Sequence, residues 1–187
     1  MSILQKRLTL EEFLALPEKK PALEFEPDGT VTQKVSPKGR HSTLQWSALE
    51  LFNRLGRPRK LWMAFPELRV TFGGASYVPD VSVFRWDRVP VTSDGNVADD
   101  FFDPPDIAVE ITSPEHRLAA PIRRCSWYVE NGVRVALLVH PPDSSVRLFR
   151  PDEEIRLARG TDSIKVSDIL PGFQLTVHEL FESLKVR

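Results

Sequence analysis

Hydrophobic and polar positions alternate most clearly in the middle of the chain, in the segment PPDIAVEITSP, residues 104–114. Prolines bound a run of mostly β-branched residues, 107–111, which has the length of a strand. Period two puts Ile107, Val109 and Ile111 on one face and Ala108, Glu110 and Thr112 on the other. Two interpretations of Glu110 are open. If the strand is central, the buried carboxylate needs a charged partner or a metal, and if the strand is at the edge of the sheet, the carboxylate lies in water.

The same patterns predict an α/β protein along the rest of the chain. A capping box at Thr9 and Glu12 begins a short helix that ends at Pro17, and a proline-glycine turn at 27–29 indicates a hairpin. Further helices are predicted at 42–55, 115–131 and 177–184, and further strands at 61–72, 77–84, 133–140 and 146–150. No repeat or linker divides the chain, so we expect a single domain over residues 1–187.

Composition restricts the class of protein. The 187 residues are 41% hydrophobic and 27% charged, with a net charge of −1, which is typical of a globular chain. There is no overall basic excess, so any contact with nucleic acid needs a local patch. The single cysteine, Cys125, cannot form an internal disulfide and lies on the apolar stripe of its predicted helix, which favours a core position. This cysteine usage, and the lack of a membrane-spanning apolar run, suggest a cytoplasmic protein.

Two carboxylates on strands are the first candidates for chemistry. Asp80 follows Pro79 at the start of an apolar strand, and Glu110 lies on the strand 30 residues later. Two carboxylates that converge at one end of a sheet suit Mg²⁺, which prefers a few hard oxygen ligands and leaves positions for water and phosphate. Glu24 lies in the first strand of the hairpin, where a carboxylate is usually solvated.

Basic and titratable residues give a weaker signal. Lys38, Arg40 and His41 lie at the entrance of the helix 42–55, where they indicate either a solvated loop or a phosphate site at a helix N-terminus. His41 has no ligand-spaced partner, so we do not expect it to bind a metal. Arg124 lies off the apolar stripe of its helix, and this position by itself favours solvent.

Several segments together resemble the PD-(D/E)XK nuclease superfamily, and more narrowly a restriction-endonuclease-like domain family common in cyanobacteria and thermophiles. Their order along most of the chain carries this resemblance. The matching segments are LTLEEFLALP, LEFEPDG, SPKGRHS, YVPDVSVF, PPDIAVEITSP and RRCSWYVENGVRVALLVHP. The resemblance implies a restriction-endonuclease-like fold, with a mixed sheet flanked by helices and a long helix between the third and fourth core strands.

The resemblance also implies roles for particular residues. Asp80 and Glu110, helped by the Ile111 carbonyl, would bind Mg²⁺ or Mn²⁺, and Glu24 would assist. The lysine of the D/E-X-K element falls at Thr112, which carries no charge. In the resembling family a helix lysine four residues before a tyrosine takes that role, and here Arg124 occupies the position. The family's aspartate one turn earlier is Ala120 in this chain.

The function that this resemblance implies is metal-dependent hydrolysis of DNA phosphodiester bonds, with Arg124 stabilising charge on the phosphate. A nuclease-fold module that binds DNA or protein without turnover is the main alternative, and hydrolysis of a smaller phosphoester is a third. DNA and a second copy of the chain, in a homodimer, are the candidate partners. Since clustered carboxylates repel one another, we expect Asp80→Asn to be neutral or stabilising without metal.

Overall fold

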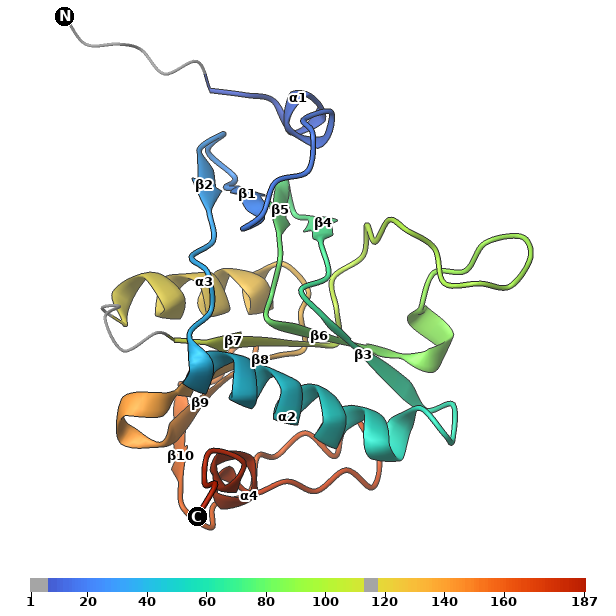
Figure 1. Ribbon diagram of the computed structural model, residues 1–187. Helices are drawn as coiled ribbons and strands as arrows, with labels where there is room; N and C mark the ends of the chain where they lie inside the picture. Colours follow the sequence, from blue (N-terminus) through green and yellow to red (C-terminus); the bar gives the residue numbers. More distant parts are fainter. Residues whose placement is uncertain (1–6, 113–117) are drawn as a thin grey trace, which may run out of the picture.

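The computed structural model describes residues 7–112 and 118–187 and has two β-sheets with helices packed around them (Figure 1). The larger sheet, in spatial order, contains β10 (Arg156–Arg159), β9 (Ser145–Phe149), β8 (Val135–His140), β7 (Ile107–Ile111), β6 (Val81–Arg85) and β3 (Trp62–Pro66). The smaller sheet contains β2 (Val31–Gln33), β1 (Leu23–Phe25), β5 (Ala75–Tyr77) and β4 (Val70–Phe72). The helices are α1 (Leu10–Leu14), α2 (Gly39–Gly56), α3 (Ala119–Glu130) and α4 (Val177–Glu182), with short 3₁₀ turns η1 (Trp86–Arg88) and η2 (Pro141–Asp143).

Strand β7 is a central strand of the larger sheet. It pairs antiparallel with β6 and parallel with β8, and the parallel pair is joined through α3. Glu110 is therefore not on an edge strand, and the first of its two sequence interpretations holds. The mixed sheet, its flanking helices and the connecting helix between β7 and β8 agree with the fold that the sequence resemblance implied.

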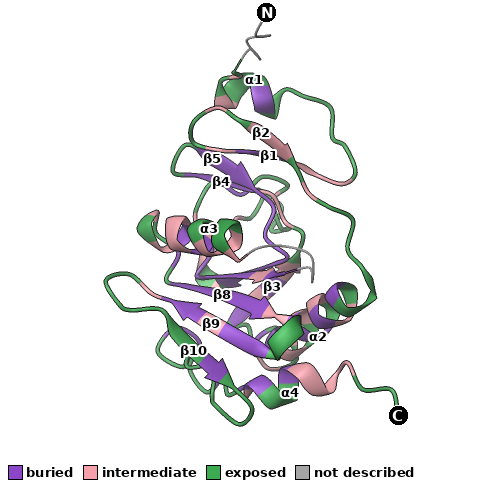
Figure 2. Cartoon of the chain, turned by 90° about the vertical axis from the view of Figure 1, so that its left-hand side faces the viewer, coloured by how far each residue is buried: buried purple, intermediate pink, exposed green. Residues whose placement is uncertain are grey.

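Period-two alternation separates the two faces of the larger sheet. Ile107 and Val109 pack into a core with residues of α2 and α4, whereas Ala108 packs with α3 and the smaller sheet. Figures 1 and 2 show α2 and α4 on one side of the sheet, with α3 and the smaller sheet on the other. Glu110 is on the same face of β7 as Ala108, so it lies on the side of the larger sheet that faces α3 and the smaller sheet.

The prediction of two long strands, 61–72 and 77–84, was wrong. Each run divides between the two sheets: β3 and β6 belong to the larger sheet, and β4 and β5 to the smaller one. Pro66 and Pro79 lie at the breaks, where they remove backbone donors, and Glu67 has a left-handed φ of 45°. Asp80 thus lies where the chain passes from the smaller sheet into the larger one.

The other local predictions agree with the structure at most points. The hairpin forms as an antiparallel pair with Phe25 opposite Val31, and Thr9 and Glu12 make the capping box of α1. Cys125 is fully buried, as its stripe predicted. The predicted helix start at 115–117 lies outside the described residues. None of the helices in the described parts combines the length and hydrophobicity that a bilayer span requires.

We expect Gly56→Ala to destabilise the fold by about 2 kcal/mol through overpacking. A Cβ at this position would lie 2.2 Å from Nε1 of Trp62, and that indole is fully buried and donates to the Phe52 carbonyl at 2.9 Å. Gly39→Ala is the matched control in the same helix, since its Cβ would meet nothing within 4 Å. Urea unfolding of both variants checks this, and equal stabilities would contradict it.

Candidate functional site

A single open cleft lies against both sheets and contains all four candidate residues, Glu24, Asp80, Glu110 and Arg124. Its volume is about 1160 Å³. The described residues that line it include six carboxylates but only three lysine or arginine side chains. The acidic residues are Glu24, Glu26, Asp28, Asp80, Glu110 and Glu130, and the basic ones are Lys34, Arg123 and Arg124. The excess of carboxylates makes the cleft favourable for a cation and unfavourable for an unaccompanied anion.

Asp80 is the most highly connected carboxylate of the cleft. Its Oδ1 accepts from Nζ of Lys34 at 2.7 Å, and its Oδ2 accepts from the backbone N–H of Ile111 at 2.7 Å. The Nε2 of His41 lies 3.0 Å from Oδ2 and donates to it in the tautomer that carries hydrogen there. The Gln45 side chain also donates to the Asp80 carbonyl at 3.0 Å. Together with the backbone N–H of Glu67, which donates to the same carbonyl at 3.3 Å, these contacts fix the residue where the two sheets meet.

The charge state of Asp80 follows from these contacts. Burial alone would raise the pKa of its carboxyl, but the hydrogen bond from His41 and the charge of Lys34 outweigh burial and lower it. For Lys34, burial favours the neutral amine, yet the negative charge of Asp80 and its neighbours gives a net rise in pKa. The two groups thus form an ionised pair in which the aspartate side chain is only 2% exposed.

Glu110 lies near Asp80, but fewer donors and positive charges of the described residues offset the negative charge of its carboxylate. The antiparallel ladder of β6 and β7 ends at the pair Val81 and Val109, and Asp80 and Glu110 are the residues directly beyond that pair. The hydroxyl of Tyr128 donates to Oε1 of Glu110 at 2.7 Å. Burial first, and then the charge of Asp80, raise the pKa of Glu110 from 4.5 to about 7. Near neutral pH this carboxyl is therefore poised between its two protonation states.

Glu24 and Arg124 form a second charged cluster in the cleft. Arg124 donates from Nη1 to Oε2 of Glu24 and from Nη2 to Oε1 of Glu26, the latter at 3.0 Å. Its guanidinium also lies over the ring of Tyr77, 4.4 Å from the centroid. The other oxygen of Glu24 accepts from the backbone N–H of Val78 at 3.0 Å, and the Tyr77 hydroxyl donates to Glu26. The cluster ties α3 to the smaller sheet.

Two expectations taken from local sequence patterns are corrected by these contacts. Glu24 is buried rather than solvated, because it receives hydrogen bonds from Arg124 and a backbone amide. Arg124 faces the cleft rather than open solvent, because these carboxylates of the smaller sheet attract it. Thr112, where the D/E-X-K element places its lysine, is buried and bonded to Nδ1 of His140 at 2.8 Å.

Sequence reasoning missed Lys34 and misplaced His41. Lys34 follows β2 and meets Asp80 only through tertiary structure, 46 positions along the chain. His41 points inward to Asp80 instead of belonging to a solvated loop or a phosphate site at the helix entrance. One signal was available, since His41 lies three residues before Leu44 on the buried stripe of α2.

The donor set fits a divalent cation bound by two carboxylates. A carboxylate offers about four acceptor positions, and donors of the described residues occupy three of them on Asp80 but one on Glu110. Mg²⁺ commonly takes one or two protein carboxylates and keeps several waters. Within residues 7–112 and 118–187, no three His, Cys, Asp or Glu side chains converge as a complete protein-made metal site. A cation held by these two carboxylates would therefore need further oxygen ligands from outside the described residues.

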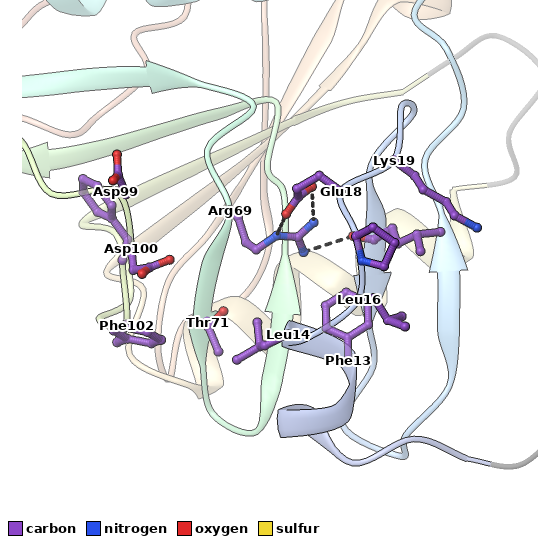
Figure 3. A pocket seen from close by; sticks show the side chains of 13 residues that line it. Phe13, Leu14, Leu16, Glu18, Lys19, Arg69, Thr71, Asp99, Asp100 and Phe102 are labelled. Carbon is purple, nitrogen blue, oxygen red and sulfur yellow. Dashed lines mark hydrogen bonds and ion pairs between the residues drawn. The ribbon is translucent and has the colours of Figure 1, made fainter.

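A second cavity, of about 250 Å³, lies between α1 and residues 99–102 (Figure 3). Arg69 donates to both oxygens of Glu18 and to the Leu23 carbonyl, so its charge is already paired there. The cavity contains none of the candidate residues that the sequence indicated. We therefore assign no chemistry to it.

The fold, with its family and structural matches, defines a restriction-endonuclease-like protein of the PD-(D/E)XK class. The family model described as "Uma2: Putative restriction endonuclease" matches residues 10–178, and the chain belongs to this family. Proteins of the restriction-endonuclease-like class generally use divalent metals.

A solved structure is also similar to this chain over nearly its whole length. It is the crystal structure of "a putative nuclease belonging to DUF820" from Anabaena variabilis. The two sequences are 34% identical, the match covers 95% of this chain and 99% of that one, and the TM-score is 0.90. No curated protein matches the sequence.

Proposed function

We propose that this chain is a divalent-metal-dependent endonuclease that hydrolyses phosphodiester bonds in DNA within the cleft of Asp80 and Glu110. The observation that carries the proposal is the position of these two carboxylates. Asp80 directly precedes β6, Glu110 lies on the neighbouring strand β7, and both line an acidic cleft. The family and the structural neighbour support the nuclease class. Mg²⁺ and Mn²⁺ are the ions that this oxygen donor set favours.

In this proposal the two clusters of the cleft have different tasks. Asp80 and Glu110 hold the cation, with the Ile111 carbonyl as a further candidate ligand. The bound cation would lower the pKa of a water and neutralise charge on the scissile phosphate. Tyr128 orients Glu110 through its hydroxyl, because burial raises the pKa of that phenol and keeps the proton in place. Glu24, fixed by Arg124, is positioned to orient a water molecule.

We expect Glu110→Gln to reduce Mn²⁺-dependent nicking of supercoiled plasmid on the order of 100-fold, because it removes one of two charged ligands. Glu130→Gln is the matched control: it makes the same change on an exposed residue of the same cleft and should nick like the wild type. Equal nicking by wild type and Glu110→Gln would contradict the proposed site, because the activity would then not depend on Glu110. A contaminating nuclease would give the same result.

A binding module without turnover is the second candidate, and the state of Arg124 favours it. The guanidinium that should stabilise the phosphate is bonded to Glu24 and Glu26 instead. In the same plasmid assay, this function predicts no nicking by wild type with Mn²⁺. It also predicts DNA binding whose affinity falls as salt concentration rises.

A further inference from the structure

Among residues 7–112 and 118–187, the lysine in direct contact with the paired carboxylates is Lys34, which the family pattern does not assign. Its Nζ donates to Oδ1 of Asp80 and to the carbonyl of Val78, both at 2.7 Å. An ammonium has three N–H donors, and the described residues supply two acceptors. The side chain is 16% exposed and lines the cleft, so one donor is left for a group that enters it.

The two positions from which the nuclease pattern would supply this charge do not provide it. Thr112 carries no charge and is bonded to His140. Arg124 has both terminal nitrogens on carboxylates, and Tyr77 covers its plane. To face a phosphate, Arg124 would have to leave Glu24 and Glu26 as uncompensated charges in a partly buried cluster, which is costly.

We propose that Lys34 is the phosphate-binding cation of this site, and that Arg124 is a positioning residue for Glu24. The inference rests on the proposed function, since it assigns the phosphate contact within that reaction. A lysine suits the task because its ammonium is a compact charge on a flexible stem and can share its donors between Asp80 and a phosphate oxygen. The charge reaches the site from the end of β2 instead of from β7 or α3.

Two measurements on Lys34→Gln separate a phosphate contact from a merely structural role. The first is plasmid nicking with Mn²⁺, which we expect to fall on the order of 100-fold, the typical effect of losing one charge-stabilising donor. The second is the Mn²⁺ concentration that gives half of the maximal thermal stabilisation. We expect this concentration to stay equal or to decrease, because a positive charge 2.7 Å from Oδ1 opposes a second cation on Asp80.

Two variants serve as controls. Lys34→Arg keeps the positive charge and should retain most of the nicking. Lys165→Gln removes an exposed lysine outside the cleft and should nick like the wild type. A parallel loss of nicking and Mn²⁺ affinity in Lys34→Gln would overturn the inference, because Lys34 would then only order Asp80 for the metal. Unchanged nicking in that variant would also overturn it while leaving the proposed function standing. A wild type that does not nick defeats the proposed function itself, and the inference with it.

Discussion

Replacing Asp80 with alanine is expected to lower the unfolding free energy of the metal-free protein by about 3 kcal/mol, as the loss of one partner from a buried ion pair does. The substitution leaves the ammonium of Lys34 and the backbone N–H of Ile111 without their shared acceptor. It also removes the hydrogen bond that Nε2 of His41 makes, and Nδ1 of this ring already has no partner among the described residues. Buried donors that lose acceptors retain their full desolvation cost.

Urea unfolding in EDTA measures this loss, with Asp168→Ala as the control. Asp168 is also paired with an arginine, Arg150, but its side chain is 56% exposed, so its loss should cost less than about 1 kcal/mol. Asp80→Asn should fall between the two, because the amide oxygen can still accept from Ile111. If Asp80→Ala is no more destabilising than Asp168→Ala, the buried pair contributes little to the fold.

From the sequence alone, Asp80→Asn is expected to be neutral or stabilising in the absence of metal. From the sequence, the carboxylates form a cluster of like charges, and neutralising one relieves repulsion. The structure reverses this expectation for Asp80, because its partners lower the pKa of its carboxyl and so favour the charged form. The repulsion instead acts on Glu110, whose pKa is raised. The difference arises from Lys34 and His41, which are 46 and 39 positions away from Asp80 in the chain.

Strand β7 shows what the sequence could predict well. Its length and the division of its two faces follow from β-branched residues with period two, a local pattern that tertiary packing reinforces. Its central place was one of two interpretations that the sequence left open, and the sheet order decides it. The convergence of Asp80 and Glu110 was a hypothesis from their two strands that the resemblance strengthened, because no local rule pairs residues on separate strands. The position of Arg124 was the most difficult to predict. Its place off the apolar stripe of α3 indicated solvent, whereas the carboxylates of Glu24 and Glu26, in and beside the smaller sheet, hold it in the cleft.

Glu110 differs from Asp80 because its surroundings favour the neutral acid. Burial and the negative charges of Asp80 and Glu24 raise its pKa, whereas Lys34 and Arg124 oppose the rise only in part. The Tyr128 hydroxyl donates to one oxygen and can do so to either protonation state. Between pH 4.5 and about 7 the folded protein therefore binds a proton that the unfolded chain has released.

Linkage fixes the sign of the effect on stability. Because the folded state binds more protons in this interval, the contribution of Glu110 to the unfolding free energy decreases as pH rises from 4.5 to about 7. The full effect is about 3 kcal/mol, since one pKa unit corresponds to about 1.4 kcal/mol. Above pH 7 the ionised carboxylate persists as a constant penalty, which a bound cation would relieve.

Glu110→Gln should therefore stabilise the metal-free protein at pH 8 by up to about 3 kcal/mol and change its stability little at pH 5. The amide is neutral throughout and its oxygen can still accept from Tyr128, so the variant keeps the contact and loses only the charge. Urea unfolding of both proteins in EDTA, across pH 5 to 8.5, gives the difference directly. Adding Mn²⁺ at pH 8 should stabilise the wild type more than the variant, which reverses or narrows the gap. A difference that does not vary with pH would show that the penalty at Glu110 is not one of ionisation.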